Sequence, residues 1–275
     1  MNGELAQVIA LAAHGSAWLA RPLSDPPRLE PDNSTFKYVA RVHFQLSDPG
    51  TSPPGTSSVA EWLQAARERS IERFWLYIPE STLPADFPAR MHAAFSNGAR
   101  WKLIGTSQGR VKEIWRPTWR PLTKSSRDRR IWHVQYKGRS LDEMAPPHQP
   151  STTASAERLL LALERIEGFA RAPDARRHDL SGWADSFAEA RQLGHAEDPE
   201  PPYHPDLLPH AEFGRSARQL LAMATRAWVF GGMGSWNDVS FGTPEQEAEA
   251  GVMSAELFSA ELVAFVAATN SRLES

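Results

Sequence analysis

The chain of 275 residues contains no cysteine. This absence excludes disulfide bonds, a cysteine nucleophile and every metal site built on thiolates, and it suits a reducing compartment. The sequence has no run that approaches the roughly 20 apolar residues of a membrane span. The apolar residues 5–20 follow Glu4 rather than the basic segment that begins a secretory signal. We therefore expect a cytoplasmic protein that does not bind a membrane.

The two halves of the chain carry opposite charge. Residues 146–275 contain no lysine and have a net charge of −9, whereas residues 1–145 have a net charge of +6, which leaves −3 overall. Three prolines and a Ser/Thr cluster make residues 146–155 typical of a linker. Length and charge together predict a basic domain over 1–145 and an acidic domain over 156–275.

Apolar periodicity predicts an α+β fold. In the first half, segments that alternate apolar and polar residues indicate strands, and apolar residues spaced three and four apart indicate helices. The turn 105–109 favours a β-hairpin that leads into a β-meander. The expected helices are 3–20 (amphipathic), 57–70 and 87–95, and the expected strands are 36–46, 74–78, 101–104, 111–119 and 131–136.

The second half has a helical period throughout. Four apolar faces, which begin near Leu159, Trp183, Leu220 and Leu262, predict a small helical bundle. The residues 243–246 read Thr-Pro-Glu-Gln, which is the cap, N1 proline and N3 glutamine of a helix start.

Residues 230–238, Phe-Gly-Gly-Met-Gly-Ser-Trp-Asn-Asp, are the part of the chain least like average composition. The segment follows an apolar helix, so a structural turn held by glycines and local side-chain hydrogen bonds is the first interpretation. The second is a surface that binds a partner protein, and the third is a backbone nest for an anion. The candidate contact residues in this segment are Met233, Ser235, Trp236, Asn237 and Asp238.

A basic, tryptophan-rich region covers residues 100–139, where twelve Lys and Arg face two acidic residues. One interpretation is a β-meander with its tryptophans in the core and its cations in solvent. The others are a docking face for an acidic protein and a nucleic-acid surface in which tryptophans stack on bases. The candidate contact residues here are Arg116, Trp119, Arg120 and Arg130.

Two further patterns concern chemistry. Residues 105–109 match the G-x-S-x-G nucleophile elbow of serine hydrolases at Ser107, but no helix is expected after it and the hairpin turn is favoured. His204 and His210 share a proline-rich loop with Asp206, without the spacing of a metal site. We expect no catalytic residue, metal or cofactor.

The second half also carries a resemblance. Leu159-Leu160-Leu161, Ile166, Trp183-Ala184, Phe187 and Phe230–Asp238, followed by the hydrophobic Val239, are similar to an uncharacterised bacterial domain family with a Gly-Gly-Met-Gly-Ser-aromatic-Asn-Asp signature. The resemblance covers less than half of the chain and implies an accessory or immunity-type domain.

These observations lead to one main functional hypothesis and two alternatives. The main hypothesis is a non-enzymatic bacterial binding protein of the immunity or antitoxin type, which blocks a partner protein such as a toxin. The alternatives are a nucleic-acid-associated protein that uses residues 100–139 and a serine hydrolase at Ser107.

Overall fold

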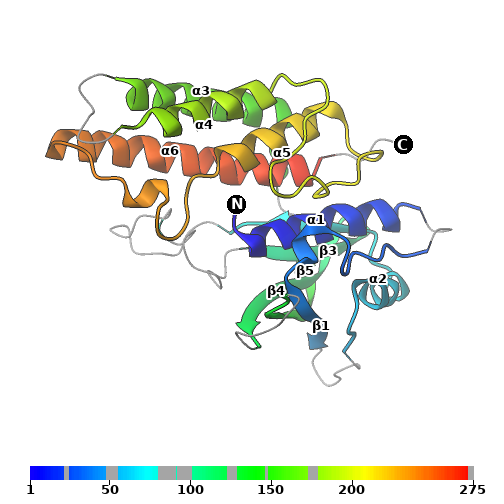
Figure 1. The fold of residues 1–275 in the computed structure, drawn as a ribbon. Coiled ribbons are helices and arrows are strands. Elements are labelled where there is room, and N and C mark those ends of the chain that lie inside the picture. Colours follow the sequence, from blue (N-terminus) through cyan, green and yellow to red (C-terminus); the bar gives the residue numbers. More distant parts are fainter. Residues whose placement is uncertain are drawn as a thin grey trace.

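The computed structural model describes residues 1–21, 25–47, 55–79, 91, 101–122, 129–145, 148–172 and 179–271. It has two layers, a layer of helices and a mixed β-sheet, with a helix between them (Figure 1). The predicted α+β class is confirmed. The predicted helix 87–95 lies outside the described residues, apart from residue 91.

The sheet has five strands in the order β1-β5-β4-β3-β2. The expected meander is confirmed as three antiparallel strands, each of which ends later in the chain than predicted. The first strand, β1, pairs with β5 in parallel. Gln108 and Gly109 both have positive φ and form the two-residue hairpin turn between β3 and β4. The strands are β1 (Val39–Ser47), β2 (Arg73–Tyr77), β3 (Lys102–Ser107), β4 (Arg110–Pro121) and β5 (Trp132–Met144).

The helix α1 (Gly3–Leu19) differs from its prediction. An amphipathic helix was expected, but 14 of its 17 residues are buried. The reason is its position, because the sheet covers one side of α1 and the helical layer lies over the other (Figure 1). A polar residue inside this helix has its own partner, since the Gln7 amide oxygen accepts a 2.9 Å hydrogen bond from the Tyr136 hydroxyl of β5.

The remaining helices follow the predicted periods. Ser58 caps α2 through a 3.2 Å hydrogen bond from the backbone N–H of Glu61, and Thr243 and Gln246 form the expected capping box. Ser151 caps α3, so the last four residues of the predicted linker 146–155 are helical. The helices are α2 (Val59–Glu68), α3 (Thr152–Arg171), α4 (Ser181–Leu193), α5 (Arg215–Ala227) and α6 (Pro244–Thr269), with short 3-10 turns η1 (Ser34–Phe36) and η4 (Trp236–Asp238).

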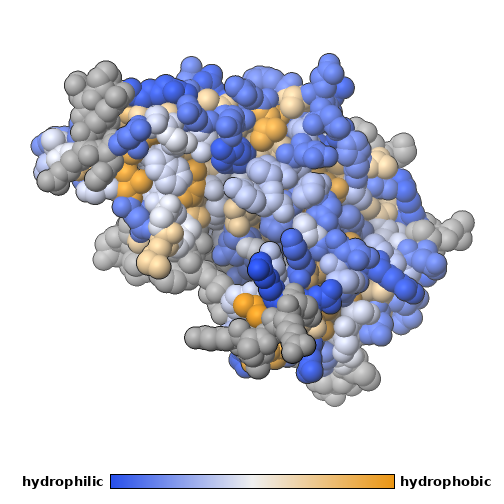
Figure 2. All heavy atoms as spheres, in the orientation of Figure 1, coloured by the Kyte–Doolittle hydropathy of each residue, from blue (hydrophilic) through white to orange (hydrophobic). Residues whose placement is uncertain are grey.

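The buried residues of the two halves form one continuous hydrophobic cluster. The visible face of the helical layer is mostly hydrophilic, with hydrophobic atoms in small spots between the helices (Figure 2). The helices therefore direct their apolar sides inward, toward α1 and toward one another.

By length and composition, one of the described helices, α6, could cross a membrane. No such helix was expected from the sequence. Half of its most apolar window is buried inside the fold. In the fold, α6 packs against α3 and α5.

The open edge of β2 is covered by side chains from two helices. The Ser16 hydroxyl of α1 donates to the Phe74 carbonyl at 2.8 Å and accepts from the Phe74 N–H at 3.0 Å. The Asn270 side chain, at the end of α6, accepts from the Leu76 N–H at 2.8 Å and donates to the Leu76 carbonyl at 2.9 Å. Both residues thus take the place of a neighbouring strand.

We predict that Asn270→Ala destabilises the fold by about 2–4 kcal/mol, because it leaves the buried N–H and C=O of Leu76 without partners. Urea unfolding measures the change. As the control, Gln64→Ala removes an exposed amide that contacts Glu68 and should alter stability by less than about 0.5 kcal/mol. Equal effects of the two substitutions would show that the Asn270 contact does not hold the edge.

Glu261 on α6 gives a second prediction. The residue is fully buried, neither carboxylate oxygen has a hydrogen-bond partner among the described residues, and burial raises its pKa well above the usual 4.5. The folded protein holds this proton to higher pH than the unfolded chain does. Its contribution to stability therefore falls as pH rises above about 4.5 toward the raised pKa.

Glu261→Gln should have nearly wild-type stability near pH 4 and should exceed it near pH 8 by about 1–3 kcal/mol, because the amide cannot ionise. Urea unfolding of both proteins across this pH range measures the difference. Glu249→Gln, an exposed change on the same helix, should keep the wild-type pH dependence. A Glu261→Gln curve that runs parallel to wild type would contradict the assignment.

Candidate functional site

The signature turn, Gly231–Asp238, is held mainly by its own polar groups. The Ser235 hydroxyl donates to the Gly231 carbonyl at 3.1 Å and accepts from the Asn237 N–H at 3.3 Å. The Asp238 carboxylate accepts from the Gly234 N–H at 2.6 Å, and Gly234 has a φ of 82°, which suits glycine. The first interpretation of this segment, a structural turn, agrees with these contacts.

Trp236 is an internal residue of this turn, which corrects its proposed role as a contact residue. Only 2% of it is exposed, and its indole N–H donates to the Ser254 hydroxyl of α6 at 2.8 Å. Its ring packs edge-on against Trp183 and Phe187 of α4, with centroids 5.7 and 5.4 Å away. The side chain is therefore a fold element that fixes the turn between α4 and α6.

The other candidates in the turn divide into two groups. Ser235 and Asn237 are half-buried, and their hydrogen bonds are made within the turn. Asp238 is exposed but accepts from Gly234, so Met233 is the candidate whose side chain is wholly in solvent, with 101% relative exposure. A large apolar side chain at the tip of a fixed turn is typical of a contact residue.

A cleft of about 650 Å³ lies beside the signature turn and is called the turn cleft below. Its walls include Trp183, Tyr203, Thr225, Arg226 and Trp228. The sequence interpretation missed it because these residues come from three separate segments.

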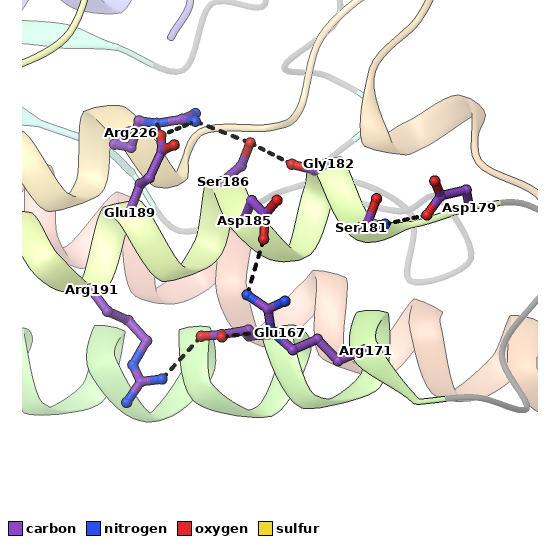
Figure 3. Close-up of polar contacts among 10 residues, drawn as sticks. All are labelled: Glu167, Arg171, Asp179, Ser181, Gly182, Asp185, Ser186, Glu189, Arg191 and Arg226. Atoms are coloured by element: carbon purple, nitrogen blue, oxygen red, sulfur yellow. Dashed lines mark hydrogen bonds and ion pairs between the residues drawn. The ribbon is translucent and has the colours of Figure 1, made fainter.

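Arg226 of α5 reaches over α4 to Glu189 and Ser186 at one side of the turn cleft (Figure 3). Its Nε donates to the Glu189 carboxylate at 2.8 Å, and its Nη2 donates to the Ser186 hydroxyl at 3.1 Å. A second set of ion pairs lies between α3 and α4, where Glu167 of α3 accepts from Arg191 of α4 at 3.0 Å and from Arg171 of its own helix at 3.0 Å.

The basic region 100–139 places its tryptophans inside. Trp101, Trp115 and Trp119 are at most 8% exposed, and Trp132 is half-buried against Trp119. Trp119 is therefore not a contact residue, because alternation along β4 directs it into the core. The same alternation directs the cations of β4 and β5 outward.

The outward side chains of three adjacent strands form a cationic face, defined here as Arg41, Arg116, Arg120, Lys137 and Arg139. All five are exposed, and none of them forms an ion pair with a carboxylate in the part of the chain that the structure describes. Among the described outward side chains of β1, β4 and β5 there is no aspartate or glutamate.

Two cations on this face stand directly opposite each other, since Arg116 of β4 pairs with Lys137 of β5 in the sheet register. Arg120 and Arg41 lie on either side of His133. Burial and the neighbouring Arg116 lower the pKa of Lys102 on β3. Opposed like charges across strands destabilise a sheet, so this arrangement is costly for the isolated protein.

A second cleft, of about 830 Å³, lies at the β1 edge and includes Arg130, the last candidate residue, with Arg41 and His133. The start of α2 also lines it, but its backbone N–H groups are already bound. Glu30 accepts from the Val59 N–H at 2.5 Å, and Glu61 accepts from the Ser57 N–H at 3.0 Å. The helix start thus holds the protein's own carboxylates.

Neither chemical pattern brings a catalytic arrangement together. Ser107 is buried at the end of β3, and a two-residue turn leads straight into β4, so the strand-turn-helix geometry of a nucleophile elbow is absent there. The Ser34 hydroxyl contacts His204 Nδ1 at 2.9 Å and also the Asp206 carboxylate, which ties η1 to the helical half. His210 lies elsewhere, against Asp198. Within the described ranges, no three metal-ligating side chains converge.

Comparison with protein-family models, with curated proteins and with solved structures gives no match. The resemblance carried by the signature turn therefore stays a prediction.

The burial of Trp236 and the exposure of Met233 predict opposite mutational effects. Trp236→Ala should cost about 3–5 kcal/mol in urea unfolding, since it empties a packed site and breaks the bond to Ser254. Met233→Ala should change stability by less than about 0.5 kcal/mol. A large loss for Met233→Ala would place that side chain in the fold rather than in solvent.

Proposed function

We propose that this chain is a non-enzymatic bacterial binding protein of the immunity or antitoxin type, which binds and blocks a partner protein through the cationic face. The observation that carries the proposal is that Arg116 and Lys137 stand directly opposite each other on an exposed face of the sheet. The described residues of this face include no aspartate or glutamate. An acidic partner surface removes this repulsion when it binds, so the charges favour the complex over the free protein. The lack of cysteine fits the cytoplasm as its compartment.

Two further features support a protein partner. The face spans three adjacent strands, which offers a protein surface several side chains to contact, and Met233 offers an apolar contact elsewhere on the molecule. At Ser107 strand β3 leads into strand β4 rather than into a helix, so this geometry does not support the hydrolase alternative.

Nucleic acid is the second candidate, because the same cations would attract phosphates. Base stacking, however, needs open aromatic rings. The half-buried rings of β2 are covered by the protein's own cations, since Arg73 lies 4.1 Å from the Trp75 centroid and Lys102 lies 5.7 Å from the Tyr77 centroid. The arrangement thus favours a protein partner over a single-stranded nucleic acid.

Lys137→Glu separates binding from folding. The new carboxylate would stand opposite Arg116, so we expect stability to rise by about 0.2–1 kcal/mol while capture of the partner is lost. Affinity purification from the native host, with the wild type and the variant as baits, measures capture, and urea unfolding measures stability. Expression of the captured partner without this chain should arrest growth if the partner is a toxin.

Arg158→Glu is the control for charge, because it makes the same charge change on the exposed side of α3 and should leave capture unchanged. It also removes a 2.8 Å hydrogen bond to Ser259 of α6, so its stability is measured alongside. A protein that is always recovered alone, or a partner that both variants capture equally, would overturn the proposal. Fluorescence polarisation with labelled single-stranded RNA at low salt tests the alternative. Tight, salt-sensitive binding that Lys137→Glu abolishes would assign the face to nucleic acid instead.

A further inference from the structure

The turn cleft has the size and the walls of a small-molecule site. Its volume of about 650 Å³ falls within the range of roughly 300–1,000 Å³ that such sites occupy. Trp183, Trp228 and Tyr203 supply aromatic walls from three segments of the helical half. Tyr203 is 80% exposed and adopts a φ of 71°, which a bulky residue rarely does.

One polar group in the wall has no partner. Thr225 lines the cleft, it is only 2% exposed, and its hydroxyl forms no hydrogen bond with any described residue. An unpaired buried hydroxyl destabilises a protein, so a group that completes its hydrogen bonding would be favoured. The two serine hydroxyls of this wall are already bound, since Ser186 donates to Gly182 and Ser235 donates to Gly231.

Arg226, the next residue, adds a second donor, and its positive charge is shared with the Glu189 carboxylate. Its Nε and Nη2 atoms are held by Glu189 and Ser186 (Figure 3). No described residue accepts a hydrogen bond from its Nη1 atom. A fixed guanidinium beside a free hydroxyl donates to an acceptor, and an anionic acceptor such as a carboxylate gains most from both.

We propose that the turn cleft binds a small aromatic carboxylate. The ring lies among Trp183, Trp228 and Tyr203, and the carboxylate accepts hydrogen bonds from the Thr225 hydroxyl and from Arg226. Most of its walls belong to the helical half, and Met1, Asn2 and Gly3 at the start of α1 complete them. The site does not depend on the cationic face of the sheet or on the proposed partner.

Isothermal titration with phenylacetate, the smallest ligand with both features, tests the proposal on the full chain. A fragment of this size should bind with a Kd on the order of 1 mM. Phenylacetamide, which lacks the charge, should bind about tenfold more weakly, and phenethylamine, with the opposite charge, should not bind detectably. Thr225→Val, which keeps the shape and removes the hydroxyl, should weaken phenylacetate about tenfold, and Thr225→Ser should restore it.

A variant that fills the cleft distinguishes binding in the cleft from binding elsewhere on the protein. A Cβ atom at Gly232 would meet no atom within 4 Å, so Gly232→Leu should fold and fill the cleft, which abolishes binding. Gly168→Leu, at an equally open glycine on α3, should bind like the wild type. The proposal would be overturned if phenylacetate gave no heat of binding at a concentration about ten times the expected Kd. Tighter binding of phenethylamine than of phenylacetate would also overturn it, as would an unchanged affinity for phenylacetate in Thr225→Val or Gly232→Leu.

Discussion

The open edge of β2 is the constraint on which the rest of the structure depends. A strand edge exposes N–H and C=O groups that need partners, and here two helices supply them through Ser16 and Asn270. Arg73 reinforces the second contact, because its Nη2 donates to the carbonyls of Asn270 and Ser271 at the end of α6. The edge thereby fixes α1 and α6 relative to the sheet, and the halves share one core.

This arrangement explains why the two surfaces of interest have different chemistry. With α1 and the helical layer on one side of the sheet, the inward residues of β4 and β5 are mostly apolar or aromatic and the exposed cations point outward. The exception is the inward Glu113, which is buried and paired with Arg69. In the helical half, α6 fixes Trp236 through Ser254, and the turn then borders a cleft next to α4. The cationic face and the turn cleft are therefore both consequences of how the layers are joined.

The sequence predicts the features that depend on local rules. The hairpin turn at Gln108-Gly109 and the capping box at Thr243 follow from short patterns, and both are present. The burial of α1 on all sides was not predictable, because an apolar helix with a few polar residues reads as amphipathic until its neighbours are known. The pairing of Arg116 with Lys137 depends on the strand register. The cleft beside Thr225 depends on four segments that the chain brings together only when folded.

Most of the residues that make the signature turn conspicuous have a role within the fold. Gly234 permits the positive φ, Ser235 and Asp238 close the turn, and Trp236 anchors it, so a change at any of these positions would damage the structure first. The residues free to determine specificity are Met233 at its tip and Thr225 and Arg226 beside it, and two of these lie outside the signature. Proteins that share the signature would therefore share this turn, while what each of them binds would depend on the neighbouring side chains.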